Sequence, residues 1–343
     1  MIDLRSDTVT KPNERMRQEM MSASVGDDVY GEDPTINKLE EFAAHLLNKE
    51  CGLYLPSGTQ SNLAALLTHC QRGDEYIVGQ DAHTYRFEGG GAAVLGSIQP
   101  QPIHFEPNGT LSIDQITSVI KPLDSHFARS RLVCLENTQA GKALDLAYIQ
   151  QVKDLCNKHK LNFHLDGARF FNACTDKSLK PEVMAEPFDS ISICLSKGLG
   201  APMGSILMGN KEFISEARRW RKVLGGGMRQ AGIMAAGGLY ALKHNTSRLI
   251  EDHHNASLVH NALIKRFGSG SAGRRPCVRN RIECSACSPM FVQRSAGVLP
   301  RMARIADRGK RAADGRRGSS TRRTSRKCVP GLNHPKGPSP IPA

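Results

Sequence analysis

Short apolar runs alternate along the chain with longer segments in which apolar residues recur every three to four positions. The strand-like runs span residues 52–56, 75–79, 131–136, 161–167, 190–195 and 204–209. Helical spacing occurs in residues 58–70, through Leu63, Leu66 and Leu67, and in residues 146–160, through Ile149, Val152, Leu155 and Cys156. Strands separated by helices predict an α/β fold with a mainly parallel or mixed sheet that is buried on both faces.

Ligands of such sheets bind at the carboxyl ends of the strands, so the residues that follow each strand are the first candidates for a site. The run 52–56 is followed by Ser57-Gly58-Thr59-Gln60 at the start of a helix. Gly58 lets a ligand approach the backbone, Thr59 supplies a hydroxyl and the helix start supplies free N–H groups, which together outline a phosphate site. An ordinary helix N-cap explains the same residues equally well.

Asp166 lies at the end of the strand-like run 161–167 and needs a partner there. A structural ion pair with Arg169, just beyond the turn-permitting Gly167, is the favoured interpretation when Asp166 is considered alone. The alternative is that the carboxylate faces a cationic ligand atom, such as a protonated pyridine nitrogen.

Lys197 follows the run 190–195 and is itself followed by Gly198 and Gly200. A lysine that extends to water from a strand end is the ordinary explanation. The glycines argue against it, since they clear space around the amine, and a desolvated amine is a better nucleophile.

His83 follows the run 75–79, and His126 lies in the segment before the run 131–136. Neither histidine is informative alone. A phosphate cradle, an aspartate, a lysine and an imidazole at strand ends nevertheless match the needs of pyridoxal 5'-phosphate.

The net charge of +13 is concentrated in one part of the 343 residues. Residues 268–343 carry 14 arginines, three lysines and three acidic residues, so residues 1–267 are close to neutral. The basic segment has no helix or strand period and is predicted to be disordered. The charge therefore does not make the whole protein a nucleic-acid binder, and we do not expect nucleic acid as a partner.

Six of the ten cysteines lie in residues 1–267, mostly in apolar surroundings, and are expected to be buried free thiols. Cys284 and Cys287 have CxxC spacing, but no second such pair accompanies them, which argues against a zinc site. No apolar run is long enough for a membrane span, and charged residues near the N-terminus argue against a signal peptide. We expect a cytoplasmic protein.

The chain closely resembles the low-specificity L-threonine aldolases, which are fold-type I pyridoxal phosphate enzymes. The resembling segments are MIDLRSDTVTKP, VGDDVYGEDPT, LPSGTQSNLAALLTHC, EYIVGQDAH, GGGAAVLGSIQPQPI, HLDGARFFNA, SICLSKGLGAPMGS and RWRKVLGGGMRQAG. They occur in the family's order through about residue 266. The resemblance implies a large cofactor-binding domain in residues 1–247, the start of a small domain in 248–267 and an unrelated tail in 268–343.

The resemblance also implies how the cofactor is held. Lys197 would be the Schiff-base lysine, and Asp166 would face the pyridine nitrogen. Gly58 and Thr59 would hold the phosphate, and the motif of Arg229 also lies at the cofactor.

For the substrate, the resemblance implies cleavage of L-threonine or L-allo-threonine to glycine and an aldehyde. Ser6 and Arg169 would bind the amino-acid carboxylate, with Tyr30 and Lys222 around the site. The family works as a homotetramer built from dimers that share active sites.

The resemblance assigns the two histidines to the chemistry. His83 would stack on the cofactor ring and His126 would lie near the β-hydroxyl, whose proton His83 or an ordered water would take. Another fold-type I lyase, an aminotransferase or an inactive remnant with a basic tail are the alternatives.

Two segments depart from the family. Gln139 stands where the family usually has a histidine, in ENTQAGK. Nothing after Gly268 resembles the family's small domain, which supplies a second arginine for the substrate carboxylate. A shifted reading frame after residue 267 explains this composition better than a genuine basic tail.

Overall fold

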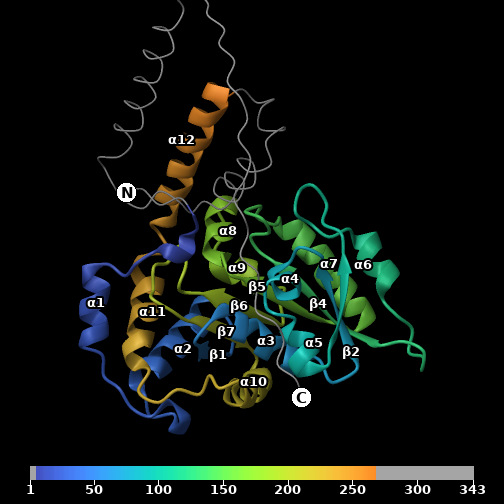
Figure 1. The fold of residues 1–343 in the computed structure, drawn as a ribbon, viewed down its shortest axis with the longest axis horizontal. Helices are drawn as coiled ribbons and strands as arrows, with labels where there is room; N and C mark the ends of the chain where they lie inside the picture. The colour runs from blue at the N-terminus through green and yellow to red at the C-terminus, as the bar shows by residue number, and fades with distance from the viewer. Residues whose placement is uncertain (1–4, 268–343) are drawn as a thin grey trace, which may run out of the picture. The chain divides into compact units, whose positions relative to one another are not determined.

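The protein is described here from a computed structural model, which describes residues 5–267 (Figure 1). The zinc, frameshift and nucleic-acid interpretations of residues 268–343 lie outside the described residues. The strands are β1 (Cys51–Leu55), β2 (Asp74–Gly79), β3 (Gln99–Ile103), β4 (Arg129–Glu136), β5 (Asn162–Gly167), β6 (Ser190–Cys194) and β7 (Ser205–Gly209). All six predicted strands are confirmed to within two residues.

Helices connect these strands. The 3-10 turns are η1 (Asp7–Val9) and η2 (Asp28–Tyr30), and the first helices are α1 (Glu14–Met21), α2 (Pro34–Leu46), α3 (Gly58–His69), α4 (His83–Arg86), α5 (Gly91–Gly96) and α6 (Ile113–Val119). The others are α7 (Leu146–His159), α8 (Phe170–Lys177), α9 (Pro181–Ala185), α10 (Lys211–Val223), α11 (Gly232–His244) and α12 (Leu249–Phe267). The two helices expected from apolar spacing, α3 and α7, are confirmed.

The strands form one sheet in the order β1-β7-β6-β5-β4-β2-β3. Only β7 runs against its neighbours, so the described sheet is mixed but mostly parallel, as predicted. The sequence pattern missed β3, because Pro100 and Pro102 interrupt its apolar character. Proline cannot donate to a sheet ladder, and β3 lies at the edge of the sheet, where this loss is tolerated.

Helices cover both faces of the sheet (Figure 1). On one face α3 packs against the central strands, and α10 packs beside α3. The other face carries a larger apolar core, to which α2, α7, α8 and α11 contribute. Side chains of β4 alternate between the two cores, with Leu132 and Cys134 on the α3 face and Val133 and Leu135 on the other. This alternation is the geometry of a strand buried on both sides.

The last described element, α12, contacts α8, and its first residue Leu249 is fully buried. The boundary that we placed at residue 248 therefore coincides with the start of a helix. The assignment of residues 248–267 to a second domain stays a prediction. Within residues 5–267, no helix is both long enough and apolar enough to cross a membrane.

Candidate active site

Six described strands, β1 to β6, share one direction and end at the same edge of the sheet. The predicted site residues Gly58, His83, Asp166 and Lys197 follow or end β1, β2, β5 and β6. The structure therefore brings these four residues to one edge, where ligands of α/β sheets bind.

The backbone around Lys197 is fixed from several sides. Its carbonyl oxygen accepts hydrogen bonds from the Gly200 N–H at 2.9 Å and from the Thr10 hydroxyl at 2.8 Å. Gly200 has φ +80°, in the left-handed region that favours glycine. The Asn245 side chain donates to the Leu199 carbonyl at 2.7 Å. The loop thus holds the lysine in place from three directions.

The Lys197 amine lies among charged groups at the ends of β5 and β6. Burial raises the pKa of the Cys194 thiol, and the amine of Lys197 opposes that rise. Asp166 and Arg169 also act on this thiol, which shows that these groups share one electrostatic environment. An amine at this position can act as a nucleophile toward a carbonyl compound.

Asp166 is almost fully buried and accepts two hydrogen bonds. The Ala168 N–H donates to its Oδ1 at 3.0 Å, and the Asn62 side chain donates to its Oδ2 at 2.9 Å. The sequence favoured an ion pair between Asp166 and Arg169, but no such pair is among the described ones. Arg169 pairs instead with Asp7 of the N-terminal segment. The Asp166 carboxylate can therefore face a ligand cation.

Arg169 pairs with Asp7, whose side chain is fully buried. The guanidinium donates to Asp7 Oδ1 at 2.9 Å through Nη2 and to Oδ2 at 3.3 Å through Nε. Ser6 caps the short turn that contains Asp7, accepting from the Thr8 N–H at 3.2 Å. Asp7 thereby brings Ser6 to Arg169, the two residues expected at the substrate carboxylate.

The start of α3 forms the helix N-cap that its sequence suggested, and the phosphate site there stays a prediction. The hydroxyl of Ser57 accepts from the Gln60 N–H at 3.2 Å, which is an ordinary N-cap. The N–H groups of Gly58 and Thr59 lack partners within the helix, as in every first turn, and remain suited to an anion. A β-carbon at Gly58 would lie 2.7 Å from the sulfur of Cys194, so the close packing here requires glycine.

His83 is held at both its backbone and its ring. Its N–H donates to Glu136 Oε2 at 2.8 Å, and its Nδ1 lies 2.8 Å from Glu88 Oε1. The hydrogen bond that Glu88 accepts raises the pKa of the imidazole, although burial opposes the rise. Burial and then the Asp166 carboxylate raise the pKa of Glu136 to about 7.

Three predicted residues lie on a surface beside the start of α3. The side chains of Tyr30, Lys222 and Arg229 are exposed, and Arg229 pairs with Asp27 at 2.8 Å. The segment that joins Lys222 to Arg229 is tied to α3, because the Gln60 side chain donates to the Leu224 carbonyl at 3.1 Å. Within one chain, no described contact joins these three to Lys197.

The structure does not bring His126 to the other site residues of the same chain. Its exposed ring lies 2.6 Å from Asp124, in the segment that enters β4 at the opposite edge of the sheet from Lys197. Gln139 is buried in a tight turn in which Gln139 and Lys142 exchange two backbone hydrogen bonds. The catalytic role of His126 stays a prediction.

Sequence reasoning missed four polar residues that the structure places at the site, namely Asp7, Asn62, Glu88 and Glu136. Glu136 had the same signal as Asp166, since it ends a buried strand, β4. Asn62 lies next to the apolar residues 63–67 of α3 and is buried with them, which was a weaker signal. Asp7 and Glu88 lie outside strand ends, so their roles depend on tertiary contacts.

Comparison with known proteins agrees with this geometry. A family model described as "Beta-eliminating lyase" matches residues 3–266. The low specificity L-threonine aldolase of Escherichia coli (strain K12) is 57% identical over 257 residues, covering 75% of this chain and 77% of that protein. The low-specificity L-threonine aldolase 1 of Arabidopsis thaliana is 43% identical over 273 residues, covering 78% and 76%.

Among solved structures, the threonine aldolase of Leishmania major superposes with a TM-score of 0.68. The sequence identity is 22%, and the match covers 77% of this chain and 79% of that one, which supports the fold alone. The family match over residues 3–266 and the 57% identity go further, and they lead to one conclusion. The chain belongs to the beta-eliminating lyase family, among its low-specificity L-threonine aldolases.

Proposed function

We propose that this protein cleaves β-hydroxy-α-amino acids, L-threonine or L-allo-threonine, to glycine and an aldehyde with the help of pyridoxal 5'-phosphate. The observation that carries the proposal is the meeting of Lys197, Asp166 and the start of α3 at one edge of the sheet. An amine, a buried carboxylate and a helix N-terminus suit the aldehyde, the ring nitrogen and the phosphate of that cofactor.

When bound, the cofactor supplies an electron-accepting ring that stabilises the negative charge left on Cα. Lys197 would provide the amine that holds the cofactor. Asp166 keeps a proton at the ring nitrogen, because an ionised carboxylate nearby favours the charged form. Gly58 and Thr59 donate backbone N–H groups to the phosphate, and Arg229 supplies further positive charge.

Arg169 and Ser6 hold the substrate carboxylate, with Arg169 oriented by Asp7. Tyr30 and Lys222 border the same site. His83 covers the ring face and is one candidate for the group that takes the β-hydroxyl proton, an ordered water being the other. Glu88 holds the Nδ1 side of His83, which leaves Nε2 for the ligand. His126 is assigned to the β-hydroxyl by family resemblance.

The test is the release of glycine and acetaldehyde from L-threonine by the purified full chain loaded with pyridoxal 5'-phosphate. The family model also favours a second candidate, β-elimination, which would release a keto acid and ammonia instead. Lys197→Ala is the control, since it should lose both the products and the covalent cofactor. Appearance of neither product set in the wild-type chain would exclude both candidates.

We also propose that the protein assembles as a dimer of dimers. Supporting residues are exposed apolar side chains on and near α4 and α5, with Phe87 60%, Val94 72% and Leu95 60% exposed. Phe87 lies beside His83, with ring centroids 5.8 Å apart, so a second copy on this surface would border the site. Light scattering of the full chain tests the assembly, and a monomer at micromolar concentration would contradict it.

A cytoplasmic location is part of the same proposal. The six cysteines among the described residues are free thiols, five of them buried and Cys51 half-buried, as expected from the sequence. Free thiols suit a reducing compartment. Cell fractionation tests the location.

The frameshift hypothesis is supported by where the family match ends. That match stops at residue 266, and the Escherichia coli relative is covered over 77% of its length. Sequencing the gene decides the matter, because an alternative frame after codon 267 should encode a segment similar to the relative's remainder. If neither frame does, the hypothesis is wrong.

A further inference from the structure

A seam of polar side chains lies between α3 and the strands β5 and β6. His164 and Asp166 occupy alternate positions of β5, so both face α3, and Ser190 is paired with His164 in β6. From the helix, Asn62 and His69 face the same strands two turns apart. Asn62, His164, Ser190 and Asp166 are all at most 2% exposed.

Hydrogen bonds join these residues into one chain. His69 Nε2 lies 2.6 Å from Ser190 Oγ, which lies 2.7 Å from His164 Nδ1. His164 Nε2 lies 3.4 Å from Asn62 Oδ1. The Asn62 amide nitrogen lies 2.9 Å from Asp166 Oδ2 and 2.9 Å from Glu88 Oε1.

The chemistry of the end groups determines which atom donates at each link. Two carboxylates accept from the Asn62 amide nitrogen, so Asn62 Oδ1 must itself accept, and His164 Nε2 carries a proton. Burial lowers the pKa of both His164 and His69 to about 3, so both rings are neutral at physiological pH. His164 Nδ1 therefore accepts from the Ser190 hydroxyl, and Ser190 accepts from His69 Nε2.

All donors in this chain consequently point toward Asp166. Asn62 is the junction, because its amide group also separates Asp166 from Glu88, which holds the imidazole of His83. A ring nitrogen of His83 and carboxylate oxygens of Glu88 and Asp166 lie within 4.8 Å of one another. Without the Asn62 amide the two carboxylates would face each other at short range, which electrostatics disfavours.

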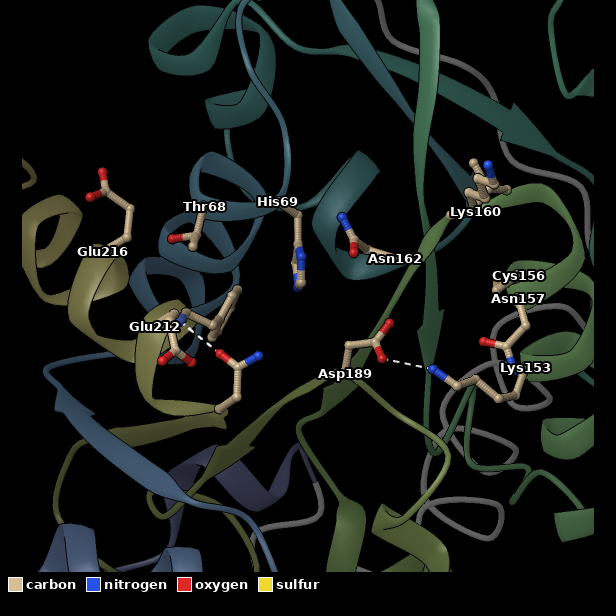
Figure 2. A pocket seen from close by; sticks show the side chains of 13 residues that line it. Thr68, His69, Lys153, Cys156, Asn157, Lys160, Asn162, Asp189, Glu212 and Glu216 are labelled. Atoms are coloured by element: carbon tan, nitrogen blue, oxygen red, sulfur yellow. Dashed lines mark hydrogen bonds and ion pairs between the residues drawn. The ribbon is translucent and has the colours of Figure 1, made fainter.

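The far end of the chain opens on a separate pocket. This pocket has a volume of about 720 Å³ and is lined by residues of α3, α7, α10 and the amino ends of β5 and β6. Figure 2 shows His69 pointing into the space between Thr68 and Asn162. It also shows the ion pair of Lys153 with Asp189, two further residues that line this pocket. The chain thus connects the amino edge of the sheet to the catalytic edge.

We propose that Asn62 and His164 are positioning residues, which with Ser190 and His69 form a directed chain of hydrogen-bond donors that orients the Asp166 carboxylate toward the cofactor ring nitrogen. The inference rests on the proposed function, since it needs a cofactor that Asp166 faces. It adds His69, His164 and Ser190 to the site and gives Asn62 a positioning role there.

The experiment follows the ring nitrogen directly. The full chain is loaded with pyridoxal 5'-phosphate that carries ¹⁵N in the ring, and NMR records the pH at which this nitrogen loses its proton. In Asn62→Leu that pH should fall by about one unit, since a lost hydrogen bond to a charged group corresponds to about a tenfold change. His164→Phe should shift it in the same direction by a smaller amount.

Ser192→Ala is the matched control, because Ser192 is buried in the same seam but bonds to Ser61 and Ser205 outside the chain. It should leave the ring-nitrogen titration unchanged. If Asn62→Leu does not fold, His164→Phe and Ser190→Ala carry the same test. Unchanged titration in folded variants of the chain, or an equal shift in Ser192→Ala, overturns the inference. A wild-type chain that binds no cofactor overturns the proposed function itself.

Discussion

The carboxylate of Asp7 lies 2.9 Å from the guanidinium of Arg169, although 162 residues separate them along the chain. Asp7 is fully buried, so the partners that offset the burial of its carboxylate among residues 5–267 are Arg169 and local hydrogen bonds. The pair fixes the N-terminal segment over the site and orients the arginine that we assign to the substrate carboxylate.

Replacing Asp7 with asparagine should therefore affect both stability and binding. We expect Asp7→Asn to lower the free energy of unfolding by about 3 kcal/mol, the scale for breaking a buried ion pair. The KM for L-threonine should rise severalfold, since Arg169 loses its orientation. Urea unfolding and steady-state kinetics measure the two effects. Glu216→Gln, which breaks the exposed pair with Arg219, should change neither, and an Asp7→Asn protein as stable as wild type would contradict the prediction.

The Glu88 carboxylate should control the titration of His83. Because its hydrogen bond raises the pKa of His83, Glu88→Gln should return that pKa toward the ordinary value of about 6.5. A raised histidine pKa stabilises the fold below about pH 6.5, and this stabilisation is lost as the pH rises through the folded value. NMR titration of the His83 ring in the cofactor-free protein measures the shift. Asp81→Asn, on the exposed pair with Arg86, is the control.

The raised pKa of Glu136 should make the free energy of unfolding depend on pH in a second range. Its pKa of about 7 in the folded protein lies above the ordinary value of 4.5, so the folded state retains a proton that the unfolded state releases. Its contribution to stability is therefore present below pH 4.5 and lost as the pH rises from 4.5 to about 7. Glu136→Gln should become more stable relative to wild type at pH 8 than at pH 5. Unfolding curves that differ equally at both pH values would argue against this.

Gly58 should tolerate no side chain while Cys194 remains in place. We expect Gly58→Ala to cost about 1–3 kcal/mol, because the added carbon would meet the Cys194 sulfur at 2.7 Å. Cys194→Ala should restore most of that loss in the double variant. A double-mutant cycle of unfolding free energies measures the coupling, and additive effects would contradict the packing argument.

Much of the fold could be predicted from the sequence, because its strands are buried on both faces and read as continuous apolar runs. The edge strand β3 was not predicted, because its prolines interrupt the apolar pattern. Prolines are tolerated in a strand only where one side of the strand needs no hydrogen-bond partner. The predicted strand ends also identified Asp166 and Lys197 as candidate site residues, because ligands of such a sheet bind at the carboxyl ends of its strands.

The partners of these residues could not be predicted in the same way. Asp166 and Arg169 are close in sequence and opposite in charge. Long-range packing nevertheless brings Asp166 to Asn62 and Arg169 to Asp7. Local spacing carries no information about such contacts. His126 illustrates the converse, since family resemblance places it at the site and the single chain does not.

The reversed strand β7 has a consequence for the order in which the site forms during synthesis. β1 is bonded in the sheet only to β7, which lies between β1 and β6. The strand β1, which leads into α3, can therefore join the sheet only after residue 209 has been made, and Lys222 and Arg229 are made later still. Until then the strand that ends before Gly58 lacks its partner in the sheet, which makes β7 the step on which completion of the sheet depends.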